Sequence, residues 1–249
     1  LANSGDNSFL NQESRNSFMI SFKVIVVHHG SLDFLILSIP ILFVGRIIGK
    51  FSPRTKEISS LRIIQAVFKF ILWEAGTKVN DNGEENVPKD TPVFIIGNHR
   101  SYFDIVLSYS RCPIRTGYIA KKEMERYPLL SNWMRYLHLP VSDRKDIKQG
   151  LKTILTAIEK IKSGISICIF PEGTRNKNKD ELELLPFHEG SFKIASKSGC
   201  AIIPMAMNNT AEIFEALYAK DQIQHMLFWN TVNDLCKRTF PKKDQKHLG

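Results

Sequence analysis

The stretch 93–104 constrains the fold of this chain more than any other. Its first four residues, Val-Phe-Ile-Ile, are apolar and mostly β-branched, which predicts a buried strand, and the Gly-Asn pair that follows ends it. Ser101 then begins a Ser-Tyr-Phe-Asp-Ile-Val-Leu segment that is typical of a helix opening. His99 is therefore predicted at a strand-to-helix turn, where a sharp bend can present an imidazole to a cleft.

Asp104 follows His99 in the first turn of the predicted helix, with its side chain leaning back toward the helix N-terminus. It can accept a hydrogen bond from one ring nitrogen and leave the other free to act as a base. The spacing alone does not decide this, because the same His-x4-Asp pattern also starts at His28 and at His138. Ser101-x-x-Asp104 is also a variant of the capping box, which would give Asp104 a purely structural role.

Composition limits the class of protein and its partners. A chain of 249 residues with 43% hydrophobic residues suits one large domain, or one domain with an appendage, and excludes global disorder. The net charge of +9 suits a polyanion, a phosphorylated substrate or an anionic membrane face. The four cysteines show no CxxC and no metal-ligand spacing, which favours a reducing, cytosolic environment.

The N-terminal part is a polar lead-in followed by apolar segments. Residues 1–22 are rich in Asn and Ser, whereas 24–48 form the most apolar stretch of the chain. Two histidines and an aspartate interrupt that stretch, and its uninterrupted part, 34–45, falls short of the ~20 residues needed to cross a bilayer. No basic segment precedes it, so it does not fit a signal peptide. Pro40 is expected to kink it further.

A second apolar segment, 61–73, predicts a helix with one narrow polar stripe that starts at Arg62 and recurs at i+3 and i+7. Trp73 ends the segment, as interfacial residues do, and the link 50–56 carries three basic residues, which suits the cytoplasmic side of a membrane. We interpret the two segments as a membrane-associated helical pair that dips into one leaflet. Two ordinary core helices are the alternative.

A polar linker after Lys78 marks the predicted domain boundary, with residues 1–78 on one side and 79–249 on the other. The second part alternates strand and helix patterns, which predicts an α/β domain. We expect strands near 93–97, 117–120, 165–170 and 201–207, and helices near 101–110, 150–164 and 190–198. On the helix 150–164, Leu151, Ile154, Leu155, Ile158 and Ile161 are expected to form the buried face.

The second informative stretch, Phe-Pro-Glu-Gly-Thr-Arg at 170–175, also follows a predicted strand. Both stretches can therefore open onto the same edge of a sheet. Gly173 allows a tight turn, and Thr174 and Arg175 offer a hydroxyl and a planar fork of donors, which suit a phosphate or carboxylate. A surface turn with an incidental arginine is the alternative.

Together, Asn-His-Arg-Ser-Tyr-Phe-Asp and Phe-Pro-Glu-Gly-Thr-Arg resemble the motifs of the 1-acylglycerol-3-phosphate acyltransferases (lysophosphatidic acid acyltransferases). The resemblance spans 50–215 and includes Ala-Lys-Lys-Glu from Ala120, Asp143-Arg144 and Ile-Ile-Pro from Ile202. It implies a glycerolipid acyltransferase-type mixed sheet flanked by helices. Beyond Ala216 the likeness fades, so the C-terminal part is expected to be atypical or truncated.

The resemblance also implies roles for individual residues. His99 would be the catalytic base and Asp104 its partner. The acceptor-phosphate site would include Arg144, Glu172, Gly173, Thr174 and Arg175, with help from Lys121.

The implied reaction transfers a fatty acyl group from acyl-CoA or acyl carrier protein to the sn-2 hydroxyl of 1-acylglycerol-3-phosphate, giving phosphatidic acid. The implied location is the cytoplasmic face of a membrane. Neither a metal nor another cofactor is implied beyond the acyl thioester, and no nucleic acid partner is expected.

Alternatives from other classes stay open. One is a non-catalytic membrane lipid-binding protein of the same fold, although such a protein would have no need for the pair His99 and Asp104. Another is a metal-dependent phosphatase, which would need more clustered carboxylates than this chain has. Among acyltransferases, glycerol-3-phosphate and other lysophospholipids are alternative acceptors.

Overall fold

The computed structural model describes residues 33–137, 139–142, 146–178, 183–211 and 213, together with the backbone of 224–229. The chain divides into two compact units. Unit 1 holds the described residues of Leu1–Asn80, Ser101–Arg111 and Asn209–His225, and unit 2 holds those of Asp81–Arg100, Cys112–Asn208 and Met226–Gly249. The predicted domain division into 1–78 and 79–249 stays a prediction.

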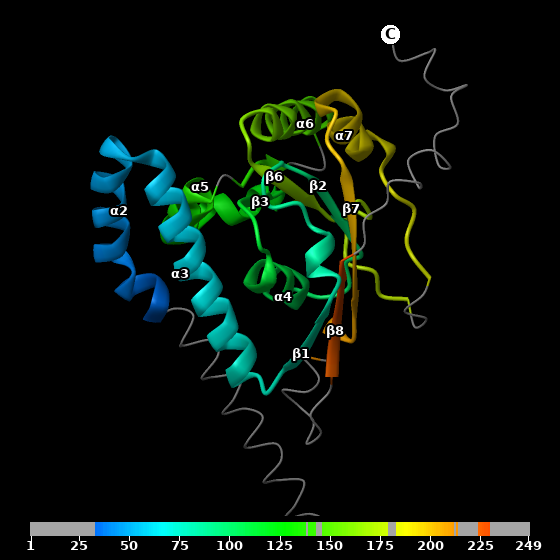
Figure 1. The fold of residues 1–249 in the computed structure, drawn as a ribbon, viewed down its shortest axis with the longest axis horizontal. Coiled ribbons are helices and arrows are strands. Elements are labelled where there is room, and N and C mark those ends of the chain that lie inside the picture. Colours follow the sequence, from blue (N-terminus) through cyan, green and yellow to red (C-terminus); the bar gives the residue numbers. More distant parts are fainter. Residues whose placement is uncertain are drawn as a thin grey trace, which may run out of the picture. The chain divides into compact units, whose positions relative to one another are not determined.

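The helices of unit 1 include α2 (Ile39–Phe51), α3 (Pro53–Glu74) and α4 (Phe103–Arg111). In Figure 1, α2 and α3 run side by side and are joined at Ser52, whose hydroxyl accepts the N–H of Thr55 and caps α3. Pro40 lies in the first turn of α2, where its missing N–H breaks no hydrogen bond of that helix. A turn at Ser38 separates α2 from the helical residues 33–37, so the apolar stretch is interrupted next to Pro40.

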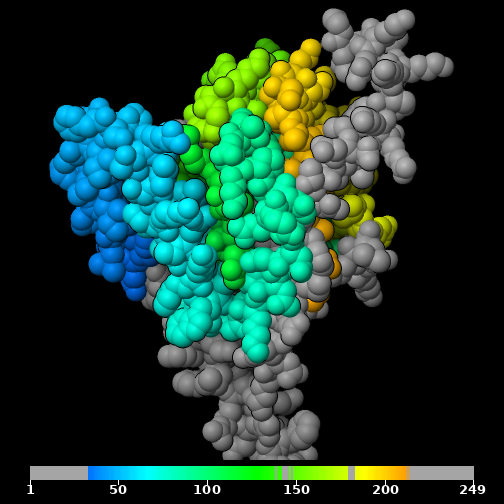
Figure 2. All heavy atoms as spheres, viewed as in Figure 1, coloured from blue at the N-terminus to red at the C-terminus, as the bar shows by residue number. Residues whose placement is uncertain are grey.

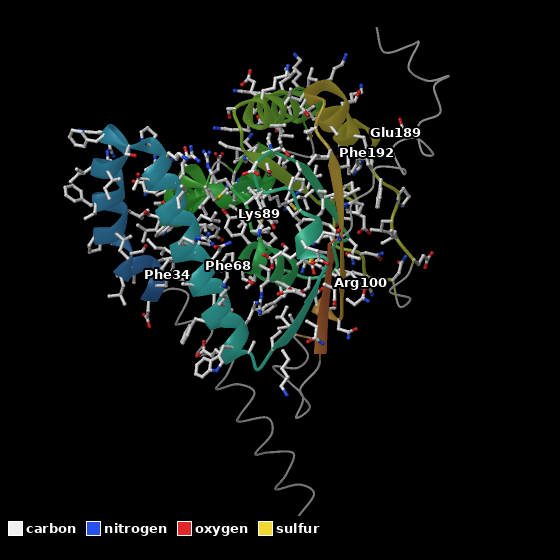
Figure 3. The ribbon with its side chains drawn as sticks, in the orientation of Figure 1. Phe34, Phe68, Lys89, Arg100, Glu189 and Phe192 are labelled. Atoms are coloured by element: carbon white, nitrogen blue, oxygen red, sulfur yellow. The ribbon has the colours of Figure 1, made fainter. Side chains whose placement is uncertain are left out.

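Of the polar stripe predicted on 61–73, Gln65 packs against α4, whereas Arg62 and Lys69 are exposed. Gln65 is buried, and its Nε2 donates to the Tyr109 carbonyl at 3.3 Å while its Oε1 accepts from Arg62 Nη1 at 3.0 Å. Phe68, labelled in Figure 3, meets the Tyr109 ring edge-on with the ring centroids 6.0 Å apart. Large apolar side chains nevertheless remain on the surface of the helix pair.

The exposed large apolar side chains of α2 and α3 are Ile39, Ile41, Phe43, Val44, Ile47, Phe51, Ile58, Phe70 and Trp73. Figure 2 shows the two helices, blue to cyan, forming one continuous surface. Within the described part of the chain, no helix is both long enough and apolar enough to cross a membrane.

A mainly parallel sheet forms the centre of unit 2. Its strands are β2 (Phe94–Gly97), β3 (Thr116–Tyr118), β6 (Ser166–Ile169), β7 (Ile202–Asn208) and β8 (Gln224–Trp229), with β1 (Lys78–Asn82), in the order β1-β8-β7-β2-β6-β3. Along the chain, β1 and β8 each begin in unit 1 and end in unit 2. β2 runs parallel to β6 and β7, with Ile95 in register with Cys168 and Ile203, and β8 runs antiparallel to β7. The predicted α/β class, with helices flanking a sheet, is confirmed.

The remaining elements of unit 2 are shorter strands and helices. β4 (Ala120–Lys121) and β5 (Val141–Ser142) form a separate two-stranded sheet. The helices are α5 (Pro128–Tyr136), α6 (Ile147–Lys162) and α7 (Lys193–Ser198), with the 3-10 turns η1 (Glu84–Asn86), η2 (Lys122–Arg126) and η3 (Glu189–Phe192).

Helices α6 and α7 cover one face of the sheet, side by side in Figure 1. The shared core consists of Phe94, Ala157, Ile158, Ile161, Ile167, Ile194, Ala195 and Ile202. The predicted face of α6 is partly wrong, because Leu151 and Leu155 are 57% and 53% exposed. The helix instead turns Ala157 and Thr153 inward, since small side chains let its backbone approach the sheet closely, and the Thr153 hydroxyl donates to the Val141 carbonyl at 2.8 Å.

Two described cysteines are core residues. Burial raises the pKa of the Cys112 thiol, and it raises the pKa of the Cys168 thiol well above its ordinary value. Such thiols stay protonated and pack as small apolar side chains. This agrees with the absence of metal-ligand spacing in the sequence.

Candidate active site

His99 follows the carboxyl end of β2, where two residues of the second motif and Asn176, directly after that motif, hold it. Its backbone N–H donates to Glu172 Oε1 at 2.8 Å, and its carbonyl accepts from the Asn176 N–H at 2.6 Å. Its ring stacks on Phe170, with centroids 4.4 Å apart and planes 17° from parallel. The imidazole is 9% exposed, so His99 is fixed at both peptide groups and on one ring face.

Parallel pairing of β2 and β6 brings the two motifs together. Phe94 is in register with Ile167 and Ile96 with Ile169, so the residues after each strand emerge at the same edge. Gly97 leaves room for this arrangement, because a Cβ there would lie 3.0 Å from Phe170 Cε1 and 2.9 Å from Met205 Cε. The predicted meeting of 93–104 and 170–175 at one sheet edge is therefore seen at His99.

Glu172 points into the protein. Its side chain is buried at 3% exposure, with Oε1 accepting the His99 N–H and Oε2 accepting the Leu185 N–H at 3.0 Å. A buried carboxylate needs such donors, and each of its oxygens has one here. Glu172 therefore ties the His99 turn to the segment 183–188.

Gly173 forms the tight turn that the sequence predicts, with φ of 70° and its N–H donating to the Phe170 carbonyl at 3.0 Å. Only glycine adopts this conformation easily, and a Cβ at this position would also lie 2.5 Å from His188 Nε2. Thr174 follows in an exposed position and Arg175 in a half-buried one. The turn thus carries an exposed hydroxyl and, next to it, a half-buried arginine.

Asp104 lies in unit 1, buried in the first turn of α4. Its Oδ2 accepts the Ser101 N–H at 2.8 Å, and the Ser101 hydroxyl accepts the Phe103 N–H at 3.2 Å. The capping interaction predicted as the structural alternative is therefore present. The catalytic role of Asp104 stays a prediction beside it.

The other predicted site residues lie elsewhere. Lys121 is exposed and pairs with Glu123, with Nζ and Oε1 3.3 Å apart. Arg144 lies outside the described residues, as do His28 and His138. Among the described residues, no group of three or more His, Cys, Asp or Glu side chains is placed to hold a metal ion.

Sequence reasoning missed two asparagines that hold the site. Asn98 pairs with Met207 of β7 through both groups of its amide, donating to the carbonyl at 2.7 Å and accepting the N–H at 2.8 Å. Asn176 supplies the N–H that His99 accepts. Arg100, labelled in Figure 3, donates through Nη2 to the Asn178 carbonyl, which adds a second link between the two loops. An asparagine directly before His99 was the signal for the first of these roles, whereas nothing local marked the second.

Comparison with known proteins places this fold and site in one family. The family model described as Acyltransferase matches residues 78–208, and the chain belongs to this acyltransferase family. It is 34% identical over 157 residues to the 1-acyl-sn-glycerol-3-phosphate acyltransferase of Borreliella burgdorferi, a match that covers 62% of this chain and 61% of that protein. It is 31% identical over 158 residues to the protein of the same name in Saccharomyces cerevisiae, covering 63% of this chain and 50% of that one. The chain thus matches between half and two thirds of the length of these relatives.

The crystal structure of the 1-acyl-sn-glycerophosphate (LPA) acyltransferase PlsC from Thermotoga maritima has a similar fold. The TM-score is 0.70 at 23% sequence identity, and the match covers 87% of this chain and 84% of that one. This likeness concerns the architecture of the chain.

Proposed function

We propose that this protein transfers a fatty acyl group from a thioester donor to the sn-2 hydroxyl of 1-acylglycerol-3-phosphate, giving phosphatidic acid. The observation that carries the proposal is the way His99 is held. Its ring stacks on Phe170, and its backbone is hydrogen-bonded to Glu172 and Asn176. A lipid-binding protein has no need of a histidine whose backbone and ring are both held in place. A general base, in contrast, must be positioned with respect to the proton that it removes. The names of the related proteins support the same reaction.

In the proposed mechanism, the secondary hydroxyl of the acceptor loses its proton to His99 as its oxygen attacks the thioester carbonyl. By the resemblance, Asp104 is the partner that orients the imidazole and stabilises the imidazolium. The tetrahedral intermediate then expels the thiolate, which takes up the proton held by the imidazolium. The donor is already activated, so no acyl-enzyme is required.

We assign the acceptor phosphate to the turn that follows β6. Thr174 and Arg175 carry the donors of this turn, and Gly173 gives it its shape. Glu172 contributes by holding the turn against His99, since both of its oxygens already accept backbone N–H groups. Arg144 and Lys121 are assigned to the same site by resemblance. Lys121 is exposed and forms an ion pair with Glu123.

The acyl donor in this proposal is acyl-CoA or acyl carrier protein, and the acceptor stays in the membrane. Phe43, Ile47 and Phe51 recur every four residues along α2, so they line one face of that helix, and they are exposed. Arg46 and Lys50 lie on the same helix, where they suit anionic headgroups. We propose that this surface enters one leaflet on the cytoplasmic side, so that the acceptor hydroxyl is reached near the headgroups without extraction of the lipid.

A thiol-release assay tests the function. Purified protein is given acyl-CoA or acyl carrier protein thioester with lysophosphatidate, glycerol-3-phosphate and other lysophospholipids in turn. Release of thiol with formation of phosphatidic acid from lysophosphatidate, absent with His99→Ala, is the expected result. Lipid binding without thiol release from any acceptor would instead support the non-catalytic lipid-binding protein.

A further inference from the structure

His188 is built into the turn that carries the acceptor-phosphate residues. Its N–H donates to the Pro171 carbonyl at 2.9 Å, and its own carbonyl accepts the Ser191 N–H at 3.0 Å. Three residues earlier, the Leu185 N–H donates to Glu172 Oε2. The segment 185–188 is thus hydrogen-bonded along the Phe-Pro-Glu-Gly-Thr-Arg turn before the chain enters η3, whose end residues Glu189 and Phe192 are labelled in Figure 3.

The imidazole of His188 lies against Gly173. A Cβ on Gly173 would be 2.5 Å from His188 Nε2 and 2.7 Å from Cδ2, so the edge of the ring that carries Nε2 meets the glycine backbone. Gly173 is followed directly by Thr174 and Arg175. His188 is exposed to solvent, but the hydrogen bonds of its backbone keep the residue next to the turn.

The phosphate of the proposed acceptor carries more negative charge and more hydrogen-bond acceptors than Thr174 and Arg175 can satisfy by themselves. A phosphate monoester carries about −1.5 to −2 charges near neutral pH and three strong acceptor oxygens. Arg175 offers one positive charge and Thr174 one hydroxyl, while the Glu172 carboxylate is directed inward to two backbone N–H groups. An imidazole can donate to a phosphate oxygen from its neutral or its cationic form, and the cationic form adds a second charge.

We propose that His188 is a ligand of the acceptor phosphate, beside Thr174 and Arg175. This rests on the proposed function and extends it by one residue that the two motifs do not contain. In this role His188 selects acceptors that carry a phosphate. Because Gly173 has no side chain, the ring has space to reach that phosphate. The competing explanation is that the ring only packs on the glycine.

The test compares His188→Ala, His188→Gln and His188→Lys with wild type. Leu184→Ala is the matched control, because Leu184 is an exposed residue directly before the segment 185–188. KM and kcat are measured for lysophosphatidate and for acyl-CoA. Binding of glycerol-3-phosphate, which has the phosphate but no acyl chain, is measured by calorimetry, and circular dichroism checks the fold.

We expect His188→Ala to raise the KM for lysophosphatidate and the Kd for glycerol-3-phosphate by at least about tenfold, as for a lost hydrogen bond to a charged group. The KM for acyl-CoA should stay within twofold. His188→Gln should be intermediate, His188→Lys should restore binding, and Leu184→Ala should behave as wild type. Unchanged glycerol-3-phosphate binding in folded His188→Ala would overturn the proposal, as would an equal loss for donor and acceptor.

Failure of the proposed function is a different outcome. If wild-type protein releases no thiol with any acceptor, acyl transfer is refuted, and the calorimetric comparison of wild type with His188→Ala still decides whether His188 binds a phosphate.

Discussion

The carboxylate of Glu172 accepts the backbone N–H of His99 at 2.8 Å, so the second motif holds the peptide group of the first. In the sequence, Glu172 stands beside Thr174 and Arg175 and looks like one more phosphate-site residue. However, Glu172 is buried, and its oxygens accept the N–H groups of His99 and Leu185. It therefore acts on the reaction through the position of His99. This makes Glu172 a positioning residue in the proposed reaction.

Substitution of Glu172 should therefore lower kcat more than it weakens acceptor binding. Glu172→Ala leaves the buried N–H of His99 unsatisfied, at about 1–3 kcal/mol, and removes the acceptor of the partly buried Leu185 N–H, so the melting temperature should also fall. Glu172→Gln can still accept from one N–H, but its amide nitrogen then faces the other, and its kcat should lie between those of Glu172→Ala and wild type. A raised KM for lysophosphatidate with unchanged kcat in Glu172→Gln would show that Glu172 binds the acceptor directly.

Local patterns in the sequence predicted much of this fold. The strands at 93–97 and 165–170 and the turn at Gly173 are confirmed, because each depends on neighbours in the chain: a β-branched run, or a glycine at a positive φ. Parallel strands then place His99 near Phe-Pro-Glu-Gly-Thr-Arg, which general sheet geometry predicts.

What the sequence could not predict depends on contacts made across long separations. The direction of the Glu172 side chain is decided by N–H groups 73 and 13 residues away. The rotation of α6, which exposes Leu151 and Leu155, follows from packing of the smaller Ala157 against the sheet. No sequence pattern marks His188, because its position beside Gly173 comes from backbone hydrogen bonds.

His99 should be the one essential histidine of the three His-x4-Asp patterns. His99→Ala is expected to abolish acyl transfer, because it removes the general base, while His28→Ala and His138→Ala should leave a folded enzyme with substantial activity. Thiol release by each purified variant measures this, with circular dichroism as the control for folding. Near-full activity of folded His99→Ala would refute the assignment.

Asn98 should set the position of the His99 turn through Met207. Asn98→Asp keeps an acceptor for the Met207 N–H but places a carboxylate oxygen against the Met207 carbonyl, where the wild-type amide donates. The free energy of unfolding should fall by about 1–3 kcal/mol, and kcat should fall with it. Chemical denaturation measures the first effect. Wild-type stability in Asn98→Asp would contradict a structural role for this amide.

Arg175 should discriminate acceptors by their phosphate. Arg175→Lys keeps the positive charge but loses the planar fork of donors, at a cost on the order of 1–3 kcal/mol in binding the phosphorylated acceptor. The KM for lysophosphatidate should rise, while the KM for acyl-CoA changes little. Equal weakening of both substrates would point to a role in the fold.

Membrane attachment should depend on the exposed face of α2. Deletion of 1–78 is a poor test, because α3 packs on α4 through Gln65 and Tyr109, so the deletion would also expose the α4 face. Surface variants avoid this. Phe43 and Phe51 are 65% and 85% exposed, so their replacement should not disturb the core.

The double variant Phe43→Gln/Phe51→Gln should bind anionic vesicles at least about tenfold more weakly, since transfer of each phenylalanine from water to an apolar phase is worth about 1.5–3 kcal/mol. Turnover should fall more on bilayer substrate than on detergent-dispersed substrate. Leu151→Gln, at a similarly exposed leucine of α6, is the matched control and should bind vesicles as wild type does. Vesicle flotation measures binding. Labelling of Ser52→Cys by a membrane-impermeant thiol reagent added outside intact cells would contradict one-leaflet attachment, because Ser52 joins α2 to α3 and must stay on the cytoplasmic side if neither helix crosses.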